Sequence, residues 1–246
     1  RVLVPMAGDD TTPEGEQVNI YGNHVGSWNF AATAYLNRWK VKIYYEHYFD
    51  DHSQMFFQYG RWKDGHIGLE ITFPKNRFID TFVYEGLGTK DQTGPMLYDS
   101  FWGKFEEQIS AKDNYYNHYL YQGWQHWGMG IGNPLLPGPI YNKNGQITFI
   151  SNRVLAHHIG FCGSPCQSLS YRMLLSYSRH WGTYDNPLNE IKKQFNSLFE
   201  VTYAPQQLKG WSFTVSGAMD RGSILGNNYG GMLVIRKQGI IKSGNK

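Results

Sequence analysis

Hydrophobic and polar residues alternate with a period of two along much of this chain. Apolar side chains occupy the even positions of residues 28–36, and the run 39–49 repeats the pattern with Trp39, Val41, Ile43 and Tyr45, with Asn37 and Arg38 between the two runs. Successive side chains of a β-strand point to opposite sides of a sheet. The pattern therefore predicts two amphipathic strands joined by a tight turn.

Seven more strands follow from the same reading, which predicts an all-β, antiparallel protein of about nine strands. They cover residues 67–73, 78–85, 153–162, 169–177, 195–203, 211–219 and 229–237. Short turns are expected after the first, third, fifth and seventh strands, the third of them at Gly163-Ser164-Pro165. Longer connections, rich in Gly and aromatic residues, are expected at 50–65, 86–146, 179–194 and 220–228.

Alternation alone fits both a soluble sandwich and a wide membrane barrel, because either fold has one apolar and one polar side to each strand. The contrast between short turns and long loops favours the barrel, since outer-membrane barrels have short periplasmic turns and longer extracellular loops. We predict an antiparallel transmembrane β-barrel in the outer membrane of a Gram-negative bacterium. Its long loops would be extracellular and its C-terminus periplasmic.

The odd strand number bears on domain organisation. Single-chain bacterial barrels close with an even number of strands, and an open edge in lipid leaves backbone groups unpaired. We therefore expect residues 1–246 to be one domain, the C-terminal half of a larger barrel that lacks its N-terminal half here. Residues 1–27 would form a lead segment on the extracellular side, and 86–146 a long loop, either extracellular or folded into the lumen. The start at Arg1, without an initiator Met, fits a processed or truncated chain.

Composition agrees with a barrel. The 18 Tyr, 14 Phe and 8 Trp exceed what a soluble core needs, whereas barrels use such residues as interfacial girdles. No apolar run approaches the roughly 20 residues of a spanning helix, and a net charge of +3 does not suggest nucleic-acid binding.

The two cysteines, Cys162 and Cys166, flank the predicted turn at 163–165. A disulfide across that turn is feasible in an oxidising compartment, and two free thiols fit equally well. Neighbouring residues do not complete a metal site, and we expect no metal and no cofactor.

The densest aromatic segment is residues 113–135, which interleave Tyr and Trp with Asn, Gln and His. Aromatic faces can stack on sugar rings while amides and imidazoles bond to their hydroxyls. The alternative is a constriction loop whose rings pack for structural reasons. We expect polysaccharide to contact Trp62, Tyr115, Tyr116, Asn117, His118, Trp124, Gln125 and Trp127.

Several segments, taken together, resemble the Wzi family of capsule-assembly outer-membrane proteins in its Bacteroidetes form. They are NHVGSWNF (23–30), YEHYFDDHS (45–53), YEGLGTKDQ (84–92), the run 113–135, WGTY (181–184), LKGWSF (208–213), DRG (220–222) and LGNNYGG (225–231). The match corresponds to the C-terminal half of a family member. It implies a barrel of about eighteen strands and a non-catalytic, lectin-like role in attaching or organising capsular polysaccharide. The chain departs from many barrels in lacking a terminal aromatic residue.

Two other functions stay open at this stage. A porin-like channel would use a lumen lined with charges of both signs: Lys40, Lys42, Glu46, Glu70, Arg153, Arg172, Glu200 and Arg236. A lipid- or glycan-modifying enzyme would need a nucleophile beside a base, such as Ser53, Ser176 or Ser178 with His47, His157 or His158, but no motif supports such a pair. Carboxylate pairs for glycoside cleavage and a calcium site at 50–52 are equally unsupported.

Overall fold

A computed structural model describes residues 26–49, 64–76, 78–91, 125–126, 129–130, 135–138, 140–141, 145, 147–184 and 186–239. These residues form strands and connections, and no helix occurs among them. The long strands are β1 (Gly26–Leu36), β2 (Trp39–Phe49), β3 (Gly65–Thr72), β4 (Thr81–Gly88), β9 (Val154–Cys166), β10 (Leu169–Gly182), β11 (Pro187–Tyr203), β12 (Trp211–Gly222) and β13 (Asn228–Lys237). Two-residue strands form two small separate sheets, β5 (Gln125–His126) with β6 (Met129–Gly130) and β7 (Ile140–Tyr141) with β8 (Ile147–Thr148).

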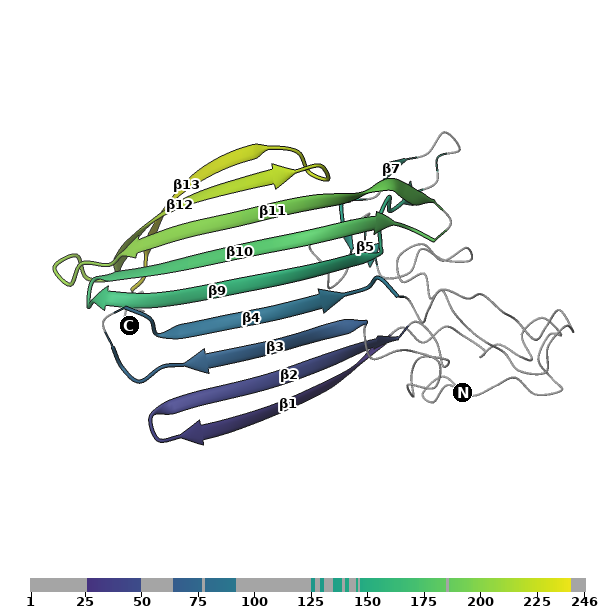
Figure 1. The fold of residues 1–246 in the computed structure, drawn as a ribbon. Helices are drawn as coiled ribbons and strands as arrows, with labels where there is room; N and C mark the ends of the chain where they lie inside the picture. The colour runs from purple at the N-terminus through teal and green to yellow at the C-terminus, as the bar shows by residue number, and fades with distance from the viewer. Residues whose placement is uncertain are drawn as a thin grey trace, which may run out of the picture.

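The nine long strands form one sheet in the order β1-β2-β3-β4-β9-β10-β11-β12-β13, and every neighbouring pair is antiparallel. This confirms the predicted all-β, antiparallel architecture, with nine strands in the main sheet. Figure 1 shows the sheet as a single curved layer. The sheet is not closed, because β1 and β13 lie at opposite edges.

The two ends of the sheet differ. At one end, called the turn end, residues 37–38, 73–80, 167–168 and 204–210 join successive strands. At the other, called the loop end, the chain leaves β2, β4, β10 and β12 (Figure 1). At the first turn, Asn37 adopts a left-handed φ of 57°, a conformation that Asn tolerates because of its short polar side chain.

The strand register separates the residues into two faces. On one rung, partners across adjacent strands are Val41, Ile71, Phe82, Phe161, Met173, Phe199, Gly217 and Gly231. One residue along, the partners are Lys40, Thr72, Thr81, Cys162, Arg172, Glu200, Ser216 and Met232. We call the side of the first rung the apolar face and that of the second rung the polar face.

Much of the apolar face is exposed among the described residues, whereas His47 and Phe49 on the same face are buried at the loop end of β2. Ile43 is 55% exposed, Phe199 50%, Val215 60% and Leu233 64%. Soluble monomers rarely expose contiguous apolar surface beyond a few hundred Å². The predicted separation of apolar and polar residues is therefore present, and in the described part of the chain the apolar side chains do not form a dry core between two sheets.

The predicted turn at 163–165 is wrong. Strand β9 continues to Cys166, and the turn is formed by Gln167 and Ser168. Gly163 pairs with Tyr171, and a Cβ there would lie 1.8 Å from the carbonyl oxygen of Phe78, so only glycine allows this close approach. Cys162 and Cys166 both lie within β9, and both are free thiols.

The predicted long loop at 179–194 is also wrong. Strand β10 runs to Gly182 and β11 starts at Pro187, which leaves only residues 183–186 between them. Alternation does not predict these strand ends, because polar residues such as Arg179 and Lys193 occupy the apolar face there. Apolar and polar residues no longer alternate there, although the backbones of β10 and β11 remain paired as far as His180 and Lys192. The connection after β12 is likewise shorter than predicted, spanning residues 223–227.

A small hydrophobic cluster lies near the loop end. Leu87 of β4 and Val154 and Ala156 of β9 pack with Leu136 and Phe149, and Leu135 and Tyr48 contact the cluster from its edge. Leu87 and Ala156 are cross-strand partners on the polar face. Parts of the long segment between β4 and β9 are therefore folded against the polar face of the sheet.

Candidate functional site

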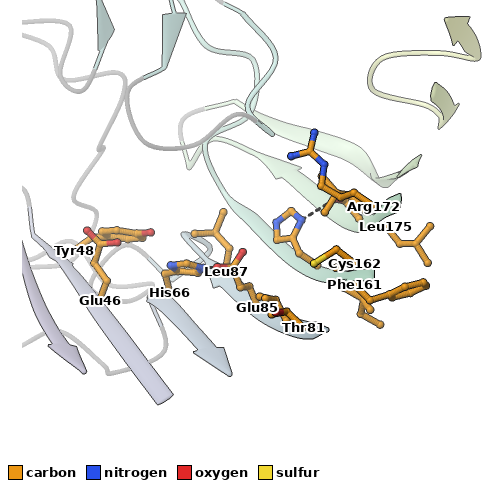
Figure 2. Close-up of a pocket in the computed structure, with 16 residues that line it drawn as sticks. Glu46, Tyr48, His66, Thr81, Glu85, Leu87, Phe161, Cys162, Arg172 and Leu175 are labelled. Carbon is orange, nitrogen blue, oxygen red and sulfur yellow. Dashed lines mark hydrogen bonds and ion pairs between the residues drawn. The ribbon is translucent and has the colours of Figure 1, made fainter. Parts of the chain in front are cut away.

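An open groove of about 600 Å³ runs across the polar face from β2 to β10. Its polar lining comes from Glu46, His66, Glu85, His158, Arg172 and Ser176, and its apolar lining includes Tyr48, Val83, Leu87 and Leu174. Figure 2 shows Glu46 and Tyr48 on one side of the groove, Arg172 on the other, and His66 and Glu85 between them. Five neighbouring strands thus contribute to one concave surface.

The register explains why these polar groups meet. One rung contains Tyr44, Gly68, Glu85, His158, Ser176, Asn196, Asp220 and Asn228 as successive partners. Facing residues on adjacent strands have Cβ atoms roughly 5 Å apart, so their side chains can bond directly. The rung is accordingly a line of hydrogen-bonding groups across the sheet.

Glu85 lies at the centre of the rung. The Tyr44 hydroxyl donates a hydrogen bond to Glu85 Oε1, and His66 Nε2 lies 3.4 Å from the same oxygen. Gly68, between Tyr44 and Glu85, has no side chain, and a Cβ there would lie 2.0 Å from Tyr44 Cζ. The absence of a side chain at position 68 lets the phenol cross β3 and reach the carboxylate.

His158 and Ser176 form a second pair on this rung. His158 Nδ1 and Ser176 Oγ lie 2.7 Å apart, and His158 is the direct partner of Glu85 on β4. A serine, a histidine and a carboxylate therefore follow one another on three adjacent strands. However, β9 and β10 are each paired on both sides, so their backbone N–H groups serve the sheet and offer no oxyanion hole. This geometry suits a hydrogen-bonding wall better than acyl transfer.

Two further ion pairs lie on the polar face. Lys40 Nζ lies 3.4 Å from Glu70 Oε1, and Arg172 Nη2 lies 3.3 Å from Glu200 Oε1. Near β1 and β12, Ser27 donates to Glu46 at 2.6 Å and Asn196 donates to Asp220 at 2.6 Å. The wall therefore carries charges of both signs at close spacing, with hydroxyls and amides between them.

Of the eight charged residues predicted to line the lumen of a channel, seven lie on the polar face. Arg153 is the exception. Arg153 precedes β9, and its guanidinium lies 3.8 Å above the Tyr184 ring, with its Nε donating to the Lys90 carbonyl at 3.0 Å. Burial raises the pKa of Tyr184, which stays protonated and donates to the Asp91 carbonyl at 2.9 Å. These contacts link the segments that adjoin β4, β9 and β10 at the loop end.

The predicted polysaccharide contacts fall almost entirely outside the described residues. Trp62, Tyr115, Tyr116, Asn117, His118, Trp124 and Trp127 are among those that the structure does not describe. Gln125 is the first residue of β5, and its backbone pairs with Gly130. The structure therefore leaves these predictions untested.

The sequence predicted only some of the residues that line the groove. The sequence offered His158 and Ser176 as residues that could pair, but it gave no signal for the position of Glu85 or His66 beside them. Only the register of four strands, β3, β4, β9 and β10, brings these groups together, and it spans the connection between β4 and β9. In the part of the chain that the structure describes, no three His, Cys, Asp or Glu side chains converge to hold a metal ion.

The described residues contain no helix that is both long enough and apolar enough to cross a membrane. Comparisons of the chain with protein-family models, with curated proteins and with solved structures each find no match.

Proposed function

We propose that this chain forms part of the wall of an outer-membrane β-barrel of the Wzi type, which binds or organises capsular or related surface polysaccharide without catalysis. The observation that carries the proposal is the two-sided, single-layered sheet, whose exposed apolar face lies opposite a polar face with a groove. Hydrocarbon outside and water inside would satisfy both faces at once.

The open edges of the sheet support the larger barrel. Strands β1 and β13 each have one side without a strand partner among the described residues. In a bilayer each unpaired backbone group costs several kcal/mol, so further strands must continue the sheet. The N-terminal half of the same barrel, or a companion subunit, would supply them.

The glycan would be contacted by the aromatic residues of the loops, with Trp124 and Trp127 as stacking platforms. A double Trp124→Ala, Trp127→Ala variant should retain less surface polysaccharide extracted from the producing cells, because stacking on sugar rings is lost. Trp211→Ala, on β12 at the turn end, is the matched control and should retain it fully. Equal retention by the double variant and the unchanged protein would contradict the proposal.

A channel is the second candidate, and the groove of about 600 Å³ with charges of both signs favours it. Rings of charge at a constriction tune the passage of small solutes. Conductance across a planar bilayer separates the two functions. Large steady currents identify a channel, whereas a barrel that holds polysaccharide and passes little current identifies a surface lectin.

A further inference from the structure

Basic residues gather on the apolar face at the loop end of the sheet. Arg179 of β10 and Lys193 of β11 are direct cross-strand partners, and Arg221 of β12 is the partner of Phe195, two residues from Lys193. Lys193 and Arg221 are exposed, and Arg179 is half-buried. We call Arg179, Lys193 and Arg221 the basic row.

Among the residues that the structure describes, no acidic side chain balances the basic row. The register places no Asp or Glu on the apolar face of the sheet. Glu190 lies in a part of β11 without a register partner on β10, and it forms no ion pair with the row within the described residues. Like charges directly opposite each other destabilise a sheet, so the Arg179 and Lys193 pair carries a cost unless an anion lies between them.

One aromatic side chain, that of Trp181, lies beside the basic row. The Trp181 ring, two residues beyond Arg179 on β10, has Arg179 Cζ 5.3 Å and Lys90 Nζ 5.0 Å from its centroid. Lys90 follows β4 and so adds a fourth cation near the same end of the sheet. Trp beside Arg and Lys is the combination expected where a protein surface passes from hydrocarbon to lipid headgroups.

The basic row borders an uncharged band of the apolar face, on the side of the band that is nearer the loop end. Three runs of apolar-face residues carry no charge: Leu169 to Tyr177, Phe195 to Tyr203 and Trp211 to Met219. The register aligns these runs side by side on β10, β11 and β12. Each run spans about 26 Å along its strand, or about 20 Å across the sheet once a barrel-like tilt is allowed for. This is close to the apolar band of roughly 25 Å that surrounds outer-membrane barrels.

We propose that the basic row, with Lys90 beside Trp181, binds the phosphate headgroups of anionic lipid in the leaflet at the loop end. The inference rests on the proposed function, because it requires the apolar face to lie in a membrane. Two guanidinium groups and an ammonium on adjacent strands match phosphate oxygens in charge and in hydrogen-bonding geometry. The lipid phosphates would also relieve the repulsion between Arg179 and Lys193.

The test measures lipid binding to the full chain in neutral detergent micelles by native mass spectrometry. Phosphatidylglycerol and phosphatidylcholine with the same acyl chains are titrated against the unchanged protein and against the triple variant Arg179→Gln, Lys193→Gln, Arg221→Gln. We expect the unchanged protein to prefer phosphatidylglycerol. The triple variant should lose roughly a hundredfold in affinity for it, since each cation near an anionic surface contributes about fivefold.

Lys192→Gln is the matched control. Lys192 is adjacent to Lys193 but pairs with His180 on the opposite face, so removing its charge should leave phosphatidylglycerol binding unchanged. The proposal is overturned if the triple variant binds like the unchanged protein, or if Lys192→Gln weakens binding as much as the triple variant does. Displacement of the lipid by inorganic phosphate at matched concentration would identify a site for free anions instead.

Insertion into phosphatidylcholine vesicles, followed by protection from added protease, distinguishes the two proposals. A protein that inserts and is protected but shows no preference for phosphatidylglycerol overturns the lipid site alone. A protein that stays outside the bilayer overturns the membrane barrel and the lipid site together.

Discussion

Arg172 and Glu200 face each other directly on β10 and β11, with Arg172 Nη2 3.3 Å from Glu200 Oε1. Ser216, the next partner along the rung, donates to Glu200 Oε2 at 3.1 Å. One carboxylate thus links three strands on the polar face, and it borders the groove that Arg172 lines.

Glu200→Gln should lower the free energy of unfolding only slightly, by less than about 1 kcal/mol, because the Arg172 side chain is half-exposed and such ion pairs contribute little. The amide oxygen can still accept from Ser216. Equilibrium unfolding in urea measures the change, with Glu190→Gln on the same strand as the control. A loss above about 3 kcal/mol would mean that this pair is buried far from water, unlike a hydrated wall.

Val215 and Thr214 are neighbours on β12 that point to opposite faces, so they test which side meets hydrocarbon. Val215→Arg should destabilise the protein in lipid vesicles by about 2–4 kcal/mol, because it places a charge near the middle of the apolar band. Thr214→Arg, on the polar face, should cost much less. The measurement is reversible unfolding in vesicles. A larger cost at position 214 than at 215 would reverse the assignment of the two faces.

Gly68 and Tyr44 test the centre of the polar rung. Gly68→Ala should displace the Tyr44 ring and break its hydrogen bond to Glu85, at a cost of about 1–3 kcal/mol. In a Tyr44→Ala background the same change should cost much less, because the ring that it would meet is gone. A double-mutant cycle on the free energy of unfolding measures this coupling. Additive effects would show that Gly68 matters for another reason, such as its backbone.

Gly217→Ala provides the control for that cycle. Gly217 also lies within a long strand, but a Cβ there would meet nothing within 4 Å. Its replacement should therefore be neutral or slightly stabilising, since alanine restricts the unfolded chain more than glycine does.

Local alternation in the sequence was enough to locate nine strands and the apolar side of each, although not all of their ends. Between Trp39 and Phe49 the predicted bounds agree with β2 because large apolar residues fill alternate positions up to Tyr45 and Phe49 ends the strand. The same reading failed between Arg179 and Gln194, where Arg179 and Lys193 interrupt the apolar face and the alternation no longer marks the strands. It also failed at Gly163, since a Gly-Ser-Pro sequence can continue a strand through a register irregularity as well as end one.

Which side chains meet depends instead on how the strands pair in the folded sheet. Glu85 and His158 are 73 residues apart in sequence, and no local pattern fixes the register between β4 and β9 across the long segment that joins them. The basic row likewise depends on how β10, β11 and β12 align, because Arg179, Lys193 and Arg221 are unremarkable as isolated charges. Alternation is a property of one strand, and it is encoded locally. Register is a property of pairs of strands, so it is set by the packing and hydrogen bonding of the whole sheet.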